Sequence, residues 1–262
     1  MPRTAVVIAT YEQPRWLALS LRAWARQTVK PAELVVADDG SGPSTREVVE
    51  RAGARHVWLP RESDRFGKCR VVNAGVRRAR ALACDHLLFT DGDCLPAHDL
   101  LARHLAHARP GRFTAGGVVR LSQARSAAAT EAEVDAFAYE SAEGGDKRRY
   151  ALPRPLGRAL DALFVRRTPF KGGNTACFAE DFAKVNGYDE RFGWGSEDKE
   201  LGERLVHAGV RGFSLRYSAP VFHLWHDRPY VNGEVIARNR ALLAETRRTR
   251  STWAPVGLAS DR

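Results

Sequence analysis

The chain has 262 residues, of which 44% are hydrophobic and 27% are charged, so it can form a sizeable core and is not wholly disordered. It carries 41 basic and 31 acidic residues, and the net charge of +10 favours an anionic partner such as nucleic acid, a membrane surface or a phosphorylated substrate. No run without a charged residue exceeds ten residues, which excludes a transmembrane helix.

The compartment is predicted from the N-terminus and the cysteines. A secretory signal is not expected, because a glutamate stands at position 12 and no small-residue cleavage site is present. We therefore expect a cytoplasmic protein. The cysteines form no CxxC pair, which predicts reduced thiols rather than a disulfide framework or a zinc site. They are Cys69, Cys84, Cys94 and Cys177.

The first 120 residues alternate apolar runs with amphipathic segments. Strands are expected at residues 5–10, 33–37, 56–59 and 86–90, and helices at 14–26, 44–52 and 70–82. The first run, AVVIAT, is continuously apolar, as in a strand that is buried on both faces. This alternation predicts an α/β fold with a doubly wound, mainly parallel central sheet flanked by helices, in which ligands bind at the carboxyl ends of the strands.

The alternation breaks after residue 122 and resumes at residue 172. We interpret 123–171 as a variable basic insert, because eight basic residues and one acidic residue lie between 147 and 171. Further strands are expected at 175–179, 212–217 and 220–224, and further helices at 196–208 and 232–247. The chain is thus predicted to form a single domain over 1–250, in which 1–122 and 172–250 are the two halves, followed by a loose tail at 251–262.

Two carboxylates follow the fourth expected strand, in Asp91-Gly92-Asp93. In an extended chain they project from one face, and the glycine between them allows a bulky ligand to approach the backbone. Oxygen ligands of this kind suit Mg²⁺ or Mn²⁺ carrying a diphosphate. Such a motif is often only a solvated turn, but its position at the end of a buried strand favours a metal site.

A second acidic motif, Asp38-Asp39-Gly40-Ser41, follows the second expected strand. One interpretation is a β-turn capped by aspartates. The other is a carboxylate that accepts a hydrogen bond from a ligand N–H, such as the imide of uracil. The first strand runs into Thr10-Tyr11-Glu12 instead of a GxGxxG loop, so dinucleotide-binding and P-loop proteins are excluded.

A third motif spans residues 193–199, in the sequence GWGSEDK. Ser196 can cap a helix that carries Glu197 and Asp198 in its first turn, where the helix dipole stabilises carboxylates. That interpretation does not explain Trp194, which lies between two glycines on what we expect to be a flexible loop. An aromatic ring placed in this way suits stacking on the apolar face of a sugar.

The fourth motif is a pair of histidines, His223 and His226. Histidines three residues apart can bind one metal ion only where a strand gives way to a turn. Lone histidines are more often structural, so the pair gains its interest from the acidic motif at residues 91–93.

Taken in order, these motifs resemble the metal-dependent, inverting glycosyltransferases of the GT-A fold, family 2. The first three, at residues 10–12, 38–41 and 91–93, are similar to the N-terminal signatures of that family. Later segments resemble the C-terminal region of galactosyltransferases and of bacterial chondroitin-type polymerases. These are Gly172-Gly173-Asn174, Asn186-Gly187-Tyr188-Asp189-Glu190 and residues 194–198. The resemblance covers about residues 4–122 and 170–228.

The resemblance implies a role for each motif residue. Donor-nucleotide contacts are implied for Thr10, Tyr11, Glu12, Asp39, Lys68, Arg70 and Asp91, with Asp39 on the uracil. Metal ligation is implied for Asp93, His226 and His223, the last of which replaces a methionine of the family. The metal would be Mn²⁺, with Mg²⁺ as the alternative. Asp198 would be the catalytic base, and Trp194 and Glu197 would hold the acceptor.

The implied activity is inverting transfer of a sugar from a UDP-sugar to a saccharide or lipid-linked acceptor, in polysaccharide or glycoconjugate synthesis. Residues 1–122 would bind the nucleotide, and 172–250 would hold the acceptor and the catalytic base. The basic insert predicts either peripheral contact with an anionic membrane at its inner face or a solvated flank of the acceptor loop.

Two other functions are alternatives to this interpretation. One is a basic α/β protein that binds polyanions or nucleic acid; its basic residues are dispersed, and no nucleic-acid motif is present, so nucleic acid is not the expected partner. The other is a nucleotide-sugar-binding protein without transferase activity. Both a metal-type residue, Asp93, and a base-type residue, Asp198, are present, which disfavours it.

Overall fold

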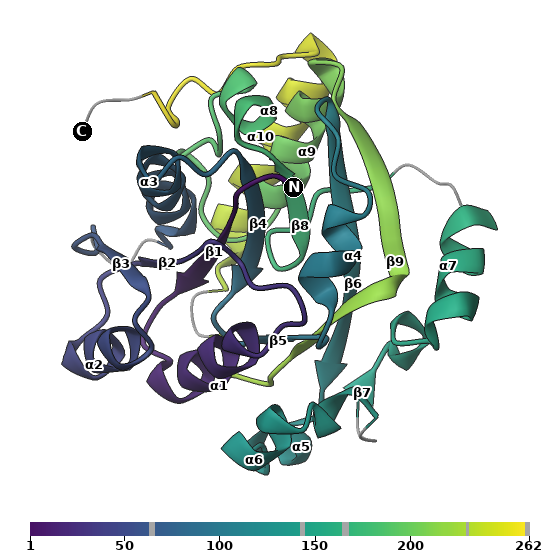
Figure 1. Ribbon diagram of the computed structural model, residues 1–262. Helices are drawn as coiled ribbons and strands as arrows, with labels where there is room; N and C mark the ends of the chain where they lie inside the picture. The colour runs from purple at the N-terminus through teal and green to yellow at the C-terminus, as the bar shows by residue number, and fades with distance from the viewer. Residues whose placement is uncertain (63–65, 142–144, 164–167, 229–230, 260–262) are drawn as a thin grey trace.

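The computed structural model describes residues 1–262 with the exception of 63–65, 142–144, 164–167, 229–230 and 260–262. In the described residues nine strands form one sheet, in the order β3-β2-β1-β4-β8-β6-β9-β5, with β7 paired to β6 (Figure 1). The N-terminal half supplies β1 (Thr4–Thr10), β2 (Glu33–Asp38), β3 (Arg55–Trp58) and β4 (His86–Asp91), all parallel.

Strand β1 lies between β2 and β4 and is buried on both faces, as its apolar run predicts. Val6 and Ile8 belong to one core cluster, together with residues of α1 (Pro14–Ala25) and α2 (Pro43–Arg51). Ala5 and Val7 belong to a second cluster on the opposite face, together with residues of α3 (Lys68–Ala81). The alternating side chains of one strand therefore anchor helices on both faces of the sheet.

The chain after β4 extends the sheet with strands of mixed direction. β8 (Thr175–Phe178) lies antiparallel between β4 and β6 (Arg112–Leu121), and β9 (Arg211–His223) lies parallel to β6. β5 (Cys94–Pro96) pairs antiparallel with β9 at the edge. Six strands thus run in one direction, which confirms the mainly parallel sheet, while β5, β7 and β8 run in the other.

Outside the insert, the described helices after β4 are α4 (Leu100–Leu105), α8 (Ala179–Lys184), α9 (Glu197–His207) and α10 (Gly233–Thr249). The expected strands at 212–217 and 220–224 are one strand, β9, whose pairing with β6 shifts register at Gly116/Gly117. β5, β6, α4 and α8 were not predicted. The other elements expected outside the insert agree with the structure to within two residues at each end.

The insert, residues 123–171, consists of short elements that pack along one edge of the domain (Figure 1). They are α5 (Gln123–Ala127), α6 (Glu131–Asp135), β7 (Gly145–Asp146), α7 (Arg154–Leu163) and 3₁₀ turns at Ala138–Glu140 and Arg148–Tyr150. Tyr139 is buried and donates to the carbonyl of Pro96 at 2.6 Å. Asp161 of α7 accepts from the backbone N–H groups of Tyr217 and Ser218 in β9.

The tail is not loose over residues 251–259. Ala254 is fully buried, and Leu258 belongs to the core cluster under α3. The Asn186 side chain donates to the carbonyl of Ala254 at 2.7 Å and accepts from the N–H of Ala259 at 2.7 Å. Two buried apolar residues and these hydrogen bonds overturn the expectation for the tail, of which 260–262 lie outside the described residues.

No described helix is long and apolar enough to cross a membrane. All four cysteines, each within the described ranges, are buried and form no disulfide, as expected.

A buried ion pair holds α9 in place. The Arg204 guanidinium binds both carboxylate oxygens of Glu200 at 2.7 Å, and each side chain is no more than 2% exposed. Arg204 also donates to the carbonyls of Val185 and Gly187, in the segment before α9. The start of α9 is thus tied to the turn that follows α8.

Replacing Arg204 by methionine should lower the free energy of unfolding by about 3–5 kcal/mol, because Glu200 becomes a buried, unpaired charge. The matched control is Arg247→Met, which removes the partner of Glu203 but whose own side chain is 53% exposed. That change should cost less than about 1 kcal/mol. Urea unfolding of both variants checks this, and equal losses would refute a special role for the buried pair.

Candidate functional site

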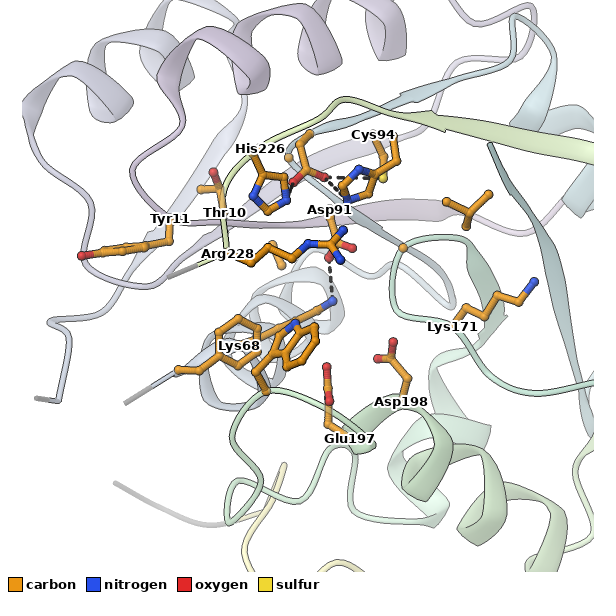
Figure 2. Close-up of a pocket in the computed structure, with 18 of the residues that line it drawn as sticks. Thr10, Tyr11, Lys68, Asp91, Cys94, Lys171, Glu197, Asp198, His226 and Arg228 are labelled. Carbon is orange, nitrogen blue, oxygen red and sulfur yellow. Dashed lines mark hydrogen bonds and ion pairs between the residues drawn. The ribbon is translucent and has the colours of Figure 1, made fainter. Parts of the chain in front are cut away.

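A cavity of about 980 Å³ opens at the carboxyl ends of β1, β2 and β4. The structure brings together most of the predicted site residues around it (Figure 2). Twelve of the thirteen line this cavity: Thr10, Tyr11, Glu12, Asp39, Lys68, Asp91, Asp93, Trp194, Glu197, Asp198, His223 and His226.

One end of the cavity is formed by the residues after β1. The Thr10 hydroxyl is buried, with no hydrogen-bond partner in the described part of the chain. The Tyr11 ring is covered on one face by the guanidinium of Arg61, 3.9 Å from its centroid. Glu12, in a left-handed conformation, accepts from the N–H of Gly42 at 2.8 Å and so joins the loops after β1 and β2. This end offers an aromatic ring and an unsatisfied hydroxyl to a ligand.

Each of the two aspartates at the end of β2 fits one interpretation of the motif: Asp38 fits the capped turn, and Asp39 fits the ligand contact. Asp38 is fully buried and accepts from the backbone and hydroxyl of Ser41 through Oδ1, and its Oδ2 lies 2.9 Å from His56 Nε2. Asp39 lines the cavity, and its Oδ2 accepts from the N–H of Gly67 at 2.9 Å. Its Oδ1 is buried without a partner among the described residues, and burial raises its pKa. Asp38 therefore shapes the turn, and Asp39 keeps an acceptor for a ligand.

Lys68, the first residue of α3, joins the acidic groups of the cavity. Its Nζ binds Oδ1 of Asp91 at 2.6 Å (Figure 2). Burial acts to lower the pKa of this lysine, but the carboxylates of Asp91, Asp198 and Glu197 outweigh burial and hold the pKa well above its usual value. Lys68 is therefore a permanent positive charge among three acidic side chains.

The candidate metal ligands lie at the end of β4 and the end of β9. Asp93 is buried; its Oδ1 lies 3.5 Å from Nε2 of His223 and its Oδ2 lies 3.0 Å from Nε2 of His226. The other ring nitrogen of His226, Nδ1, lies 2.7 Å from the carbonyl of Asp227, which only accepts. Nδ1 must therefore carry a proton. Nε2 faces the Asp93 carboxylate, which likewise only accepts, and this contact outweighs burial and raises the pKa of His226. A metal ion bound there would take the place of the Nε2 proton.

The adjacent thiol was not a predicted ligand. It is Cys94, and its sulfur lies within 4.8 Å of a carboxylate oxygen of Asp93 and a ring nitrogen of His223, which lie within the same distance of each other. The Cys94 thiol donates to Oδ1 of Asp93 at 3.6 Å, and burial and the charge of Asp93 hold its pKa well above the usual value. The other donors of the cluster are carboxylate oxygen and imidazole nitrogen, a set that fits Mn²⁺.

The loop of residues 193–195 is held from outside the cavity. The side-chain amide of Asn239, in α10, donates to the carbonyls of Gly193, Trp194 and Gly195 at 2.7–3.2 Å. Ser196 follows in a left-handed conformation, and its side chain makes no capping hydrogen bond. The loop that carries Trp194 is therefore pinned rather than flexible, and the expected serine cap is not formed.

Glu197 and Asp198 lie side by side at the start of α9. Oδ1 of Asp198 accepts from the Tyr188 hydroxyl at 2.8 Å. Glu197 is buried, and its Oε2 has no hydrogen-bond partner in the described ranges. Burial and the neighbouring Asp198 raise the pKa of Glu197 to about 7. One carboxylate is thus oriented by a tyrosine, and the other keeps an acceptor for a ligand.

Two features connect these residues to the rest of the fold. Asn73 of α3 donates to the carbonyl of Tyr188 and accepts from its N–H, both at 2.9 Å, and so fixes the tyrosine. Gly172 lies where three side chains meet, and a Cβ there would come within 3.0 Å of Asp198, Lys68 and Tyr188. This crowding explains the glycine of the Gly172-Gly173-Asn174 motif.

Arg70 is the predicted site residue that lies outside this cavity. It forms an ion pair with Glu62 at 3.0 Å and donates to the carbonyl of Pro60. An α-helix turns more than halfway round in two residues, so Arg70 leaves α3 on the side away from Lys68. Arg70 lines a small adjoining pocket that shares Asp39 with the cavity, and its contact with the nucleotide stays a prediction.

Several cavity-lining cations were not predicted. Arg228 follows His226 by two residues and Lys171 directly precedes Gly172, so nearness to a motif was an available signal. Arg61 and Arg216 lie near no motif and reach the cavity only through the fold.

Comparison with known proteins gives the family. The family model described as glycosyltransferase-like family 2 matches residues 2–253. The chain is 33% identical over 228 residues to validoxylamine A glucosyltransferase of Streptomyces hygroscopicus subsp. limoneus, which covers 80% of this chain and 49% of that protein. It is 26% identical over 224 residues to chondroitin synthase of Escherichia coli, covering 78% and 32%. The chain thus spans about half the length, or less, of these relatives.

Solved structures of low sequence identity share the fold. GalNAc-T7 with UDP, GalNAc and Mn²⁺ has a TM-score of 0.66 and 17% identity, covering 94% of this chain and 48% of that one. A mannosyltransferase of Pyrobaculum calidifontis with GDP-Man and Mn²⁺ has a TM-score of 0.57 and 21% identity, covering 87% and 59%. The expected GT-A fold is confirmed, and the match over residues 2–253 shows that the chain belongs to glycosyltransferase family 2.

Proposed function

We propose that this chain is a metal-dependent, inverting glycosyltransferase. It transfers a sugar from a UDP-sugar to a hydroxyl of a saccharide or lipid-linked acceptor, in polysaccharide or glycoconjugate synthesis. One observation carries the proposal: the cluster of Asp93, His223 and His226 lines the same cavity as Asp198, which accepts a hydrogen bond from Tyr188. The glucosyltransferase relative and the neighbours that bind nucleotide sugars support it.

The donor would bind at the N-terminal end of the cavity. Oδ1 of Asp39 has no partner in the described residues and would accept from the imide N–H of uracil. Tyr11 offers a ring face to the base, and Asp91 would face the ribose and the metal. Asp93, His223 and His226 would hold the Mn²⁺, with Mg²⁺ as the alternative. A divalent ion bound there neutralises charge on the leaving diphosphate.

The acceptor would bind at the α9 end. Asp198, held by the Tyr188 hydroxyl, would take the proton from the attacking acceptor hydroxyl, which is a poor nucleophile near neutral pH. Trp194 would stack on the acceptor sugar, and Oε2 of Glu197 would accept from one of its hydroxyls. In a single displacement, the acceptor oxygen would attack the anomeric carbon from the side opposite the diphosphate while the bond to the diphosphate breaks. This inverts the configuration of the anomeric carbon.

The alternatives differ in what they require. A polyanion-binding protein has no use for the acidic residues of every motif converging on one cavity. A nucleotide-sugar-binding protein would bind the donor but not transfer the sugar. Contact of the basic insert with an anionic membrane stays a prediction, to which α7 adds two exposed leucines, Leu156 and Leu163.

UDP should bind in the presence of Mn²⁺ and at least about tenfold more weakly in EDTA, because the metal links the diphosphate to Asp93. Asp93→Asn should lose this metal dependence, whereas Asp85→Asn, a control at the opposite end of β4, should keep it. Calorimetric titration measures both. Equal affinity with and without metal contradicts the metal site, and no binding in either condition favours the polyanion-binding protein.

Asp198→Asn should reduce the turnover of UDP-sugar by about 10²- to 10⁴-fold while leaving the affinity for UDP and Mn²⁺ unchanged. Tyr188→Phe removes only the hydroxyl that orients Asp198 and should cause a smaller loss. Release of UDP from a panel of UDP-sugars, followed by kcat, provides the measurement. If Asp198→Asn retained most of the activity, another residue would be the base.

Glu197→Gln should stabilise the protein at pH 8 and not at pH 4. The folded-state pKa is about 7 against about 4.5 for the unfolded chain, so the folded state binds more protons between these values. Wild-type stability attributable to Glu197 therefore falls as the pH rises through this window, by on the order of 1–3 kcal/mol. Urea unfolding at both pH values tests this, with Glu47→Gln on the exposed face of α2 as the control. An equal difference at both pH values would be inconsistent with the raised pKa.

A further inference from the structure

Four cations line the side of the cavity that the proposed donor and metal sites do not use. Arg120 lies on β6, Lys147 follows β7, Lys171 lies in the turn before β8, and Arg216 lies on β9. We call these four residues the basic wall. In the described part of the chain, the lining residues from β6, from 145–150, from 169–173 and at 216 include no acidic side chain.

The basic wall lies away from the residues proposed to read the nucleotide. In Figure 2, Tyr11 and Lys171 are at opposite ends of the view, and Asp91 and Asp198 lie between them. The proposed diphosphate region has cations of its own, because Lys68 binds Asp91 and Arg228 lies in the same view beside the acidic cluster. The basic wall is thus on the side of Asp198 where an acceptor would enter.

Lys171 is the most confined member of the basic wall. Its Nζ donates to the carbonyl of Gly116 at 2.8 Å, and its side chain is partly buried. Burial and the charges of Arg216 and Lys147 lower its pKa to about 8. The acid that acts on it, Asp161, is already bound by three hydrogen bonds from Tyr217 and Ser218.

The other members also lack a carboxylate partner. None of the four forms an ion pair with any described residue. Asp146 lies opposite Arg120 in the β6–β7 pairing but forms no ion pair with it. The guanidinium of Arg216 lies 5.9 Å from the centroid of the Tyr150 ring, which also lines the cavity. Mutually repelling cations in one cavity are stabilised when an anion binds among them.

We infer that the acceptor carries an oxyanion, a phosphate or a carboxylate, which the basic wall binds while a hydroxyl of the same molecule reaches Asp198. This inference rests on the proposed function and adds the chemical class of the acceptor. The aromatic ring of Tyr150 beside Arg216 provides an apolar surface for the sugar that bears the anion.

The test measures sugar binding with the donor site filled. Wild-type protein saturated with UDP and Mn²⁺ is titrated with glucose, glucuronate and glucose 6-phosphate. At least one acid should bind about tenfold or more tightly than glucose, and the preference should weaken with added salt. Tighter binding of glucose 6-phosphate identifies a phosphate as the group, and tighter binding of glucuronate identifies a carboxylate.

Variants assign the preference to the basic wall. Lys171→Gln combined with Arg216→Gln should abolish it without changing the affinity for UDP. Arg240→Gln combined with Arg248→Gln, which removes the same charge from the exposed face of α10, should retain it. Arg120→Gln, at an exposed strand position, weakens the preference without disturbing a buried group.

The other outcomes would contradict the inference about the acceptor or the proposed function. Equal binding of glucose and both acids, or a preference that survives in Lys171→Gln with Arg216→Gln, overturns the inference and leaves the proposed function intact. Loss of UDP affinity in that variant assigns the basic wall to the donor and also overturns it. Failure of the wild type to bind UDP with Mn²⁺ refutes the proposed function itself, and with it the acceptor class.

Discussion

The carboxylates of Asp91, Glu197 and Asp198 can share a largely buried cavity because the ammonium group of Lys68 lies among them. Like charges at short range in a low dielectric repel strongly, and burial adds a penalty for each ionised group. Lys68 contacts Asp91 directly at 2.6 Å and offsets both the repulsion and the burial penalty for this carboxylate. It reduces the same two effects for Glu197 and Asp198. The compensation is incomplete at Glu197, whose pKa remains about 7.

Helix α3 connects this electrostatic arrangement to the fold. Its first residue, Lys68, reaches the end of β4, and Asn73 holds the backbone of Tyr188, whose hydroxyl orients Asp198. The same helix is buried against β1 and β2. One helix of the N-terminal half therefore positions residues of both halves, and a shift of α3 would move the donor and acceptor ends together.

Sequence patterns predicted the elements and site residues whose structure depends on the nearby sequence. The apolar run of β1, the helices around it and the motif residues that follow strand ends were all found, because burial on both faces and the carboxyl-end rule leave few alternatives. The short strand β5 and the glycine-containing strand β6 carry no comparable periodicity. β5 forms by pairing with β9, and β6 forms by pairing with β8 and β9. Arg70 lies outside the cavity because its direction depends on where α3 begins, and the tail was misjudged because Leu258 meets its core partners only in the folded protein.

The hydrogen bonds from Asn239 to the 193–195 loop have a consequence for how this family member could diversify. The amide of Asn239 in α10 is not among the residues that line the cavity, yet it sets the position of the loop that carries Trp194. The loop therefore moves with any tilt or shift of that helix. Sequence drift on the outer surface of α10 can then re-aim Trp194 while every cavity-lining side chain stays the same. In such an arrangement, acceptor preference can change through substitutions in α10 that leave the catalytic residues, and hence the activity, unchanged.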